Sequence, residues 1–216
     1  MKNFLLIDDH EIVRSGVKTV LLEMFKPCEI FEASNENEAL EQLKARRYEL
    51  IIMDVQMPDT DAAGLMKNIK IKYPDAKVLI FSMSAENLYA KRFMKSGAMG
   101  FVTKNAGLSE LIKAINLALN NRKYISESFA EMLAVDLSDE KTSNPFDSLS
   151  SREFEIVSMI MSGKSLNEIS DLLSIHTSTV STHKSRLFDK LNVKNLPELL
   201  ELARAFNLKF GSSSSV

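Results

Sequence analysis

A regular alternation between short apolar runs and amphipathic stretches is the feature of this sequence that most constrains its fold. The amphipathic stretches have a helical period, as in residues 12–21 and 108–115, where apolar residues recur on one side. The short apolar runs have the length of buried strands, and they occupy residues 4–7, 29–33, 50–53, 78–81 and 99–102. Five strands alternating with five helices predict an α/β fold, in which helices cover both faces of a five-stranded parallel sheet.

The composition is typical of a globular protein in a reducing compartment. Hydrophobic residues make up 45% and charged residues 26% of the 216 residues, which allows one large domain or two small ones. Cys28 is the single cysteine and cannot form an internal disulfide. The sequence has no apolar run long enough to span a bilayer and no signal-peptide pattern at its start. We therefore expect a cytoplasmic protein that does not enter a membrane.

Three carboxylates stand just beyond two of the predicted strands. Asp8 and Asp9 follow the first strand, and Asp54 follows the third. Ligands of open α/β sheets bind beyond the carboxyl ends of the strands, and in the flavodoxin-like strand order 2-1-3-4-5 the first and third strands are neighbours. The three carboxylates would then converge, and they would repel one another unless a cation neutralises them. A hard, oxygen-seeking ion such as Mg²⁺ suits these ligands.

Two further polar residues fall at the same edge of the predicted sheet. Ser82 follows the fourth strand, and Lys104 follows the fifth. A carboxylate nucleophile, Mg²⁺, a lysine and a hydroxyl form a constellation for phosphoryl transfer, in which Asp54 attacks phosphorus and Lys104 neutralises charge on the phosphoryl oxygens. Each of these residues alone is equally well explained as a helix cap. The combination of all five favours phosphoryl transfer.

After the last predicted strand and helix, the chain changes character. Residues 126–135 predict a short helix. The polar run 138–147, which contains Pro145, is the best candidate for a linker. The following segment shows only helical periods, so we expect a separate all-α domain.

Four helices are expected in this second domain. A short turn at 174–177 separates the second helix from a third, which is expected to be capped by Ser178 and to run to about Leu191. Pro197 lies in the first turn of the fourth helix, where proline is tolerated. The first two helices start with capping boxes, a serine followed three residues later by glutamate, at residues 150–153 and 165–168.

The predicted third helix has one apolar side and one side of short polar and cationic residues. Its apolar residues, expected to pack inward, are Val180, Leu187, Phe188 and Leu191. The other side suits a DNA major groove, because cations meet phosphates and short polar side chains reach base edges. The candidate DNA contacts are Ser178, Thr179, Ser181, Thr182, Lys184, Ser185 and Arg186. The segment alone is equally well explained as an amphipathic surface helix.

Four segments of the first domain together resemble the receiver domain of bacterial response regulators. They read LLIDDHEIVRSGV, LIIMDVQMPD, LIFSMSAE and GAMGFVTK, and the resemblance covers residues 1–123. The resemblance implies that Asp54 is the phosphoacceptor. It also implies that Asp8, Asp9 and Asp54 bind Mg²⁺ together with the backbone carbonyl of Gln56.

The same resemblance assigns roles to three more residues. Ser82 would be the switch hydroxyl, and Lys104 would bind the phosphoryl group. Phe101 stands where receivers often carry an aromatic switch residue, commonly tyrosine. Because phenylalanine has no phenol, a hydrogen-bonded tyrosine switch is not available here. Residues 59–63 lack the glycine that the family often has in this loop, which leaves the loop's shape open.

The helical segment has a resemblance of its own. The run LSSREFEIVSMIMSGKSLNEISDLLSIHTSTVSTHKSRLFDKLNVKN resembles the LuxR-type helix-turn-helix domain, and the two domains together resemble the NarL/FixJ family. The resemblance makes 178–191 the recognition helix, although Ser181 and Ser185 stand where relatives frequently carry basic residues. The last helix, about 196–208, would form a dimerisation face, unless packing within the domain uses its apolar residues instead: Leu199, Leu200, Leu202, Ala203 and Phe206.

The expected domain organisation follows from these resemblances. It consists of a phosphoacceptor receiver domain at 1–123, a linker with a short helix at 124–147, a four-helix helix-turn-helix domain at 148–210 and a flexible tail at 211–216.

The expected function is that of a transcription regulator and not of an enzyme. A sensor histidine kinase would phosphorylate Asp54, and the protein would then bind double-stranded promoter DNA as a homodimer. One alternative is a Mg²⁺-dependent phosphatase, which would need a general acid shortly after Asp54, where Gln56 stands. Another is a regulator or interaction module that works without phosphorylation. In that case Asp54→Asn would leave DNA binding and transcription unchanged.

Overall fold

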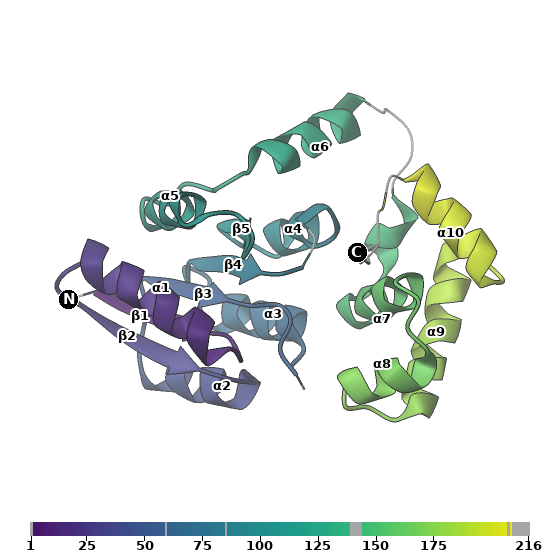
Figure 1. Cartoon of the computed structure of the whole chain (residues 1–216), viewed down its shortest axis with the longest axis horizontal. Coiled ribbons are helices and arrows are strands. Elements are labelled where there is room, and N and C mark those ends of the chain that lie inside the picture. The colour runs from purple at the N-terminus through teal and green to yellow at the C-terminus, as the bar shows by residue number, and fades with distance from the viewer. Residues whose placement is uncertain (1, 59, 85, 139–143, 207, 209–216) are drawn as a thin grey trace. The chain divides into compact units, whose positions relative to one another are not determined.

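The chain forms two compact units, within residues 1–138 and 139–216. The first unit alternates strands and helices, and the second is helical (Figure 1). The computed structural model describes residues 2–58, 60–84, 86–138, 144–206 and 208.

A parallel five-stranded sheet with the order β2-β1-β3-β4-β5 forms the centre of the first unit, which confirms the predicted topology. Two strands differ by one residue from their expected bounds. β4 includes Ser82, which was expected to follow it, and β5 lies one residue later than the expected 99–102. The strands are β1 (Lys2–Ile7), β2 (Cys28–Ala33), β3 (Leu50–Met53), β4 (Val78–Ser82) and β5 (Gly100–Thr103).

Two hydrophobic cores lie on opposite faces of this sheet, because successive side chains of a strand point to opposite sides. In β3, Leu50 and Ile52 join the core beneath α1 and α5, whereas Ile51 and Met53 join the core beneath α2, α3 and α4. The five helices are α1 (Glu11–Met24), α2 (Glu36–Ala45), α3 (Ala62–Lys72), α4 (Glu86–Lys95) and α5 (Leu108–Leu119).

A sixth helix, α6 (Glu127–Ser138), belongs to the first unit and not to a linker. Its Phe129 is 4% exposed and is part of the core beneath α4, and Met132 packs against the same core. Ser126 and Ser128 donate hydrogen bonds of 2.7 and 2.6 Å to the carboxylate of Glu86 at the start of α4. The compact unit therefore extends past residue 123, because burial of apolar side chains holds α6 on the sheet domain.

The second unit contains the expected four helices and one additional short element. The two predicted capping boxes are both formed, by Ser150 with Glu153 and by Ser165 with Glu168. Phe146 lies in the expected linker but is 1% exposed, since a short 3-10 helix places its ring in the domain core. The elements are η1 (Pro145–Ser148), α7 (Ser151–Met161), α8 (Leu166–Leu172), α9 (Thr177–Leu191) and α10 (Leu196–Ala205).

Two details of this unit differ from the sequence-based expectation. Helix α9 begins at Thr177 with His176 as its N-cap, so Ser178 lies in the first turn and does not cap the helix. The Thr177 hydroxyl is 3.2 Å from the Ser170 hydroxyl on α8, a contact between helices that local sequence does not reveal. Helix α10 ends at Ala205, short of the expected 208, and the predicted tail at 211–216 lies outside the described residues.

The apolar residues of α10 are divided between two environments. Leu199 and Ala203 are 0% and 1% exposed and pack inside the domain, so the expected dimerisation face cannot include them. Leu200, Leu202 and Phe206 are partly exposed.

Candidate functional site

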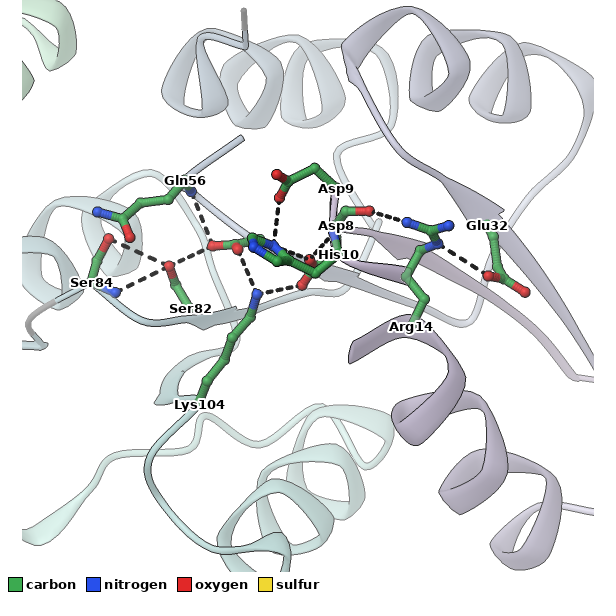
Figure 2. A network of polar contacts seen from close by, with 10 residues as sticks. Asp8, Asp9, His10, Arg14, Glu32, Gln56, Ser82, Ser84 and Lys104 are labelled. Carbon is green, nitrogen blue, oxygen red and sulfur yellow. Dashed lines mark hydrogen bonds and ion pairs between the residues drawn. The ribbon is translucent and has the colours of Figure 1, made fainter. Parts of the chain in front are cut away.

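The carboxyl edge of the sheet gathers the five residues that the sequence predicted to converge. Figure 2 labels Asp8, Asp9, Ser82 and Lys104 among them. β1 and β3 are neighbours in register, with Ile7 beside Met53, so Asp8 and Asp54 leave the sheet at the same level. Ser82 ends β4, and Lys104 follows β5, the next strand along. The topology of the sheet therefore brings carboxylates, a hydroxyl and an ammonium group to one place.

Lys104 lies between two buried carboxylates. Its Nζ is 2.6 Å from Oδ2 of Asp8 and 2.6 Å from Oδ2 of Asp54, and all three side chains are less than a tenth exposed. Burial by itself lowers the pKa of Lys104, but hydrogen bonds and charge attraction from Asp54 and Asp8 outweigh it and raise the pKa above the ordinary value. The lysine is thus a fixed positive charge beside Asp54.

The second carboxylate oxygen of Asp54 accepts two hydrogen bonds. Ser82 Oγ donates to Asp54 Oδ1 at 2.5 Å, and the backbone N–H of Gln56 donates to the same oxygen at 3.0 Å. Ser84 lies behind Ser82, with 3.4 Å between their hydroxyl oxygens, and is 3% exposed. Sequence reasoning missed Ser84, because its position two residues beyond the strand carries no signal of burial.

The acidic groups form a pocket whose chemistry is compatible with a divalent cation. Single ligand atoms of Asp8, Asp9, His10 and Asp54 all lie within 4.8 Å of one another. Oδ1 of Asp9 is buried, and none of the described residues donates a well-formed hydrogen bond to it. A buried carboxylate oxygen without a donor is costly, and coordination of a cation would satisfy it.

Arg14 of α1 holds the backbone of this pocket, a contact that the sequence did not predict. Its Nη1 donates to the backbone carbonyl of Asp8 at 2.7 Å, and its Nε donates to Oε2 of Glu32 on β2 at 3.1 Å (Figure 2). Lys18 Nζ is 2.6 Å from the other oxygen of Glu32. Hydrogen bonds from Lys18 and Arg14 lower the pKa of Glu32 despite its burial.

The remaining receiver candidates, Gln56 and Phe101, lie in contrasting environments. The side chain of Gln56 is exposed, although its backbone N–H binds Asp54. Phe101 on β5 is 2% exposed and belongs to the core that also contains Phe93 and Phe129. A movement of Phe101 would therefore have to displace packed neighbours.

The predicted outward face of α9 is exposed in the structure. Ser178, Thr179, Thr182, Ser185 and Arg186 are exposed, and Ser181 and Lys184 are partly exposed. On the opposite side, the predicted inward residues are buried at Val180, Leu187 and Leu191 and partly buried at Phe188.

The polar groups on this face bind their own helix. The hydroxyls of Thr182 and Ser185 donate to the carbonyls four residues earlier, at 2.9 and 3.2 Å. Lys184 Nζ lies 5.4 Å from the centre of the Phe188 ring. These contacts are local and solvent-accessible, so the side chains can rearrange toward a ligand.

His183 lies behind this face and is partly buried. Its Nδ1 is buried and finds no hydrogen-bond partner among the residues that the structure describes. Burial lowers the pKa of His183, and the positive charge of Arg152 lowers it further. The neutral form of the imidazole is therefore favoured.

Two family matches cover most of the chain. Residues 4–116 match the response regulator receiver domain, and residues 147–203 match the bacterial regulatory proteins of the luxR family. The chain belongs to the NarL/FixJ family of response regulators. It is thus a response regulator transcription factor, with a receiver domain and a LuxR-type DNA-binding domain.

Similar response regulators include UvrY of Escherichia coli O6:H1 and GacA of Pseudomonas aeruginosa. UvrY is 34% identical over 204 residues, which are 94% of each chain. GacA is 32% identical over 204 residues, 94% of this chain and 95% of GacA. Both relatives are therefore similar to this chain along most of its length.

Solved structures of response regulators share the fold. RcsB from Salmonella enterica serovar Typhimurium, bound to promoter rprA with the phosphomimetic BeF3-, has a TM-score of 0.65 at 23% identity and covers 93% of this chain and 97% of RcsB. A LuxR-family response regulator from Aurantimonas sp. SI85-9A1 has a TM-score of 0.58 at 28% identity, over 63% of this chain and 98% of its own.

Among the described residues, no helix is long and apolar enough to cross a membrane.

Proposed function

We propose that Asp54 of this response regulator accepts a phosphoryl group from a sensor histidine kinase and that this modification controls binding of promoter DNA by α9. One observation carries the proposal: the buried carboxylate of Asp54 lies 2.6 Å from the ammonium of Lys104 and 2.5 Å from the hydroxyl of Ser82. A nucleophile flanked by a cation and a hydroxyl donor is suited to take up a group with three anionic oxygens.

The transfer uses one carboxylate oxygen of Asp54. That oxygen forms a bond to phosphorus while the bond from phosphorus to the kinase histidine nitrogen breaks, and the imidazole leaves with the electron pair and takes up a proton. Lys104 balances charge on the phosphoryl oxygens, because hydrogen bonds and charge attraction from Asp54 and Asp8 outweigh the effect of burial and raise its pKa. In this proposal the function of the chain is regulatory and not enzymatic.

The carboxylates of Asp8, Asp9 and Asp54, with the backbone carbonyl of Gln56, are the groups that would hold Mg²⁺. The buried, unsatisfied Oδ1 of Asp9 supports this assignment. A bound Mg²⁺ ion would neutralise negative charge on the phosphoryl oxygens.

The switch follows from the hydrogen bonds of Ser82. The phosphoryl group brings about two negative charges and three acceptor oxygens. Ser82 then donates to a phosphoryl oxygen in place of Asp54 Oδ1, and this draws the segment between β4 and α4 toward the site. Phe101 moves into the space that this segment leaves. The outer surface of α4, β5 and α5 changes as a result.

The DNA-binding role rests on the exposed face of α9. Lys184 and Arg186 would contact phosphates, and the hydroxyls of Ser178, Thr179 and Thr182 would reach base edges or phosphates, with Ser181 and Ser185 beside them. RcsB, which is 25% identical with a TM-score of 0.57, has been solved as a complex with DNA. A homodimer would place two such helices on half-sites about one helical turn apart, in the cytoplasm, where promoter DNA and kinase meet.

The test combines phosphoryl transfer with DNA selection on the full chain. Wild type, Asp54→Asn and the control Asp75→Asn, which removes an exposed carboxylate, are treated with acetyl phosphate and Mg²⁺, and the added phosphoryl group is measured by intact mass. Each protein then selects genomic fragments at fixed salt, with and without beryllofluoride and Mg²⁺.

The proposal expects phosphoryl uptake by wild type and Asp75→Asn but not by Asp54→Asn. It also expects that wild type and Asp75→Asn enrich DNA fragments with a shared half-site motif only when beryllofluoride is present. Equal enrichment with and without beryllofluoride would leave a DNA-binding protein without this switch. Absence of enrichment in all samples would contradict the DNA-binding role of α9.

A further inference from the structure

His10 lies at the metal pocket but has not entered the proposed phosphoryl transfer. Its Nδ1 is 2.9 Å from Oδ1 of Asp9 and 3.3 Å from Oδ1 of Asp8 (Figure 2). His10 is the N-cap residue of α1, yet within the described part of the chain its side chain makes no capping hydrogen bond. The imidazole instead points to the carboxylates, which are the groups that would hold the cation.

The spacing of these atoms fits adjacent corners of one coordination shell. Two ligands at right angles around an octahedral ion with bonds of about 2.1 Å are separated by about 3.0 Å. The separations from His10 Nδ1 to the two carboxylate oxygens, 2.9 and 3.3 Å, lie close to that value. An ion placed among these three atoms would take both carboxylate oxygens and the imidazole nitrogen as ligands.

The oxygens near His10 are separate from those that bind Lys104. Lys104 contacts Oδ2 of Asp8, whereas His10 faces Oδ1 of the same residue. Oδ1 of Asp9 has no well-formed hydrogen bond from any described residue, although His10 Nδ1 is near it. Asp8 Oδ1 also accepts a hydrogen bond from the backbone N–H of His10 at 2.9 Å. Two carboxylate oxygens and one imidazole nitrogen, none of them bound to Lys104, are therefore close enough together to meet one cation.

A nitrogen ligand changes which ions the pocket prefers. Mg²⁺ binds oxygen ligands and gains little from an imidazole, whereas Co²⁺, Ni²⁺ and Zn²⁺ bind imidazole well. We propose that the receiver pocket of this protein is a site for a divalent first-row transition ion, in which Nδ1 of His10 is a ligand beside Asp8, Asp9 and Asp54. This inference rests on the cation pocket of the proposed function and adds to it a fourth side chain and a class of metal.

Co²⁺ and Mg²⁺ are the probes that separate this inference from the proposed function. Both ions are titrated into the full chain. Binding of Co²⁺ is followed by its visible absorption, and binding of Mg²⁺ is measured by calorimetry. The variants are His10→Gln and, as a matched control, His176→Gln. His176 is likewise an exposed N-cap residue whose side chain makes no capping hydrogen bond within the described residues, but it lies on α9 in the other unit.

The expected result is a loss of Co²⁺ affinity of about tenfold or more in His10→Gln, a scale reached even by changes outside the ligand shell. Mg²⁺ affinity should change less than about threefold in the same variant, because its ligands are oxygens. His176→Gln should match wild type with both ions. Because the His10 side chain is 64% exposed, its replacement leaves the buried core intact.

Two other outcomes would overturn the inference in distinguishable ways. Unchanged Co²⁺ affinity in His10→Gln, with normal Mg²⁺ binding, would remove His10 from the site and leave the proposed function standing. Binding of neither ion by wild type would overturn the transition-ion site and the Mg²⁺ step together. As a direct readout, pulsed electron paramagnetic resonance of bound Mn²⁺ should show coupling to one nitrogen in wild type and none in His10→Gln.

Discussion

The receiver pocket and the exposed face of α9 both use charged and hydroxyl side chains, but they hold them in opposite ways. In the pocket, Asp8, Asp54 and Lys104 are buried and bind one another directly. On α9, Arg186 and its neighbours are exposed, and the hydroxyls bind the backbone of their own helix. Buried partners depend on each other strongly, whereas exposed groups contribute independently and are screened by salt. The pocket is therefore suited to chemistry, and the helix face to adaptable binding.

The largest expected effect is a loss of stability when the buried ammonium of Lys104 is removed. Lys104→Met leaves the carboxylates of Asp8 and Asp54 without their cation, which should destabilise β1 and β3 by about 3–5 kcal/mol. Hydrogen exchange of these strands, resolved by mass spectrometry in the full chain with a chelator present, measures the change. Lys113→Met, on an exposed side chain, should cost less than about 0.5 kcal/mol. Equal effects of the two substitutions would contradict the claim that burial makes the pocket interdependent.

A double-mutant cycle sharpens the same contrast. Asp54→Asn and Lys104→Met remove two atoms in contact, so their effects on the stability of β3 should differ from additivity by about 1–3 kcal/mol. Thr179→Ala and Arg186→Ala lie two helical turns apart on α9, and their effects on DNA affinity should add within about 0.5 kcal/mol. The cycle uses hydrogen exchange for the first pair and binding isotherms on a selected fragment for the second. Strong coupling on α9 together with additivity in the pocket would reverse the comparison.

The contribution of one exposed cation on α9 should be smaller and depend on salt. Arg186→Ala should weaken DNA binding by about 1 kcal/mol and, if the guanidinium contacts a phosphate, reduce the slope of log affinity against log salt by about one. Fluorescence anisotropy over a range of salt concentrations measures both quantities. Arg204→Ala on α10 serves as the control, and an identical change of slope in that variant would assign the effect to net charge.

An effect of similar size is expected from a buried charge within the helical unit itself. Burial alone raises the pKa of Glu153, but the hydrogen bonds from Lys190 at 2.6 Å and from the Ser150 backbone outweigh it and lower the pKa below 4.5. A carboxyl with a lowered pKa in the folded state stabilises the fold above its unfolded pKa, and this contribution disappears as the pH falls through the folded pKa.

Glu153→Gln should therefore cost about 1 kcal/mol at neutral pH and flatten the acid dependence of stability of α7 and α9. Hydrogen exchange of α7 at several pH values provides the measurement, with Glu201→Gln as an exposed control. If stability fell with pH in the same way in wild type and Glu153→Gln, the pair of Glu153 and Lys190 would not be the cause of the acid dependence of the helical unit.

Much of this protein was predictable from local sequence patterns. The periods of the apolar residues indicated the sheet, its helices and the outward face of α9, because a side chain's side of a strand or helix depends only on its position along the chain. Strand order then brought Asp8, Asp54, Ser82 and Lys104 together, since parallel strands end at one edge. The capping boxes of α7 and α8 were equally local.

Other features were decided by tertiary packing. The burial of Phe129 makes α6 part of the first unit, and the burial of Leu199 removes it from any dimerisation face. Arg14 binds the Asp8 carbonyl, and His10 turns toward Asp9 instead of capping α1. Each of these outcomes depends on which side chain fills a space offered by a distant segment. The sequence pattern specifies the faces of the elements, but contacts between elements set the rotamers and the partners of the side chains.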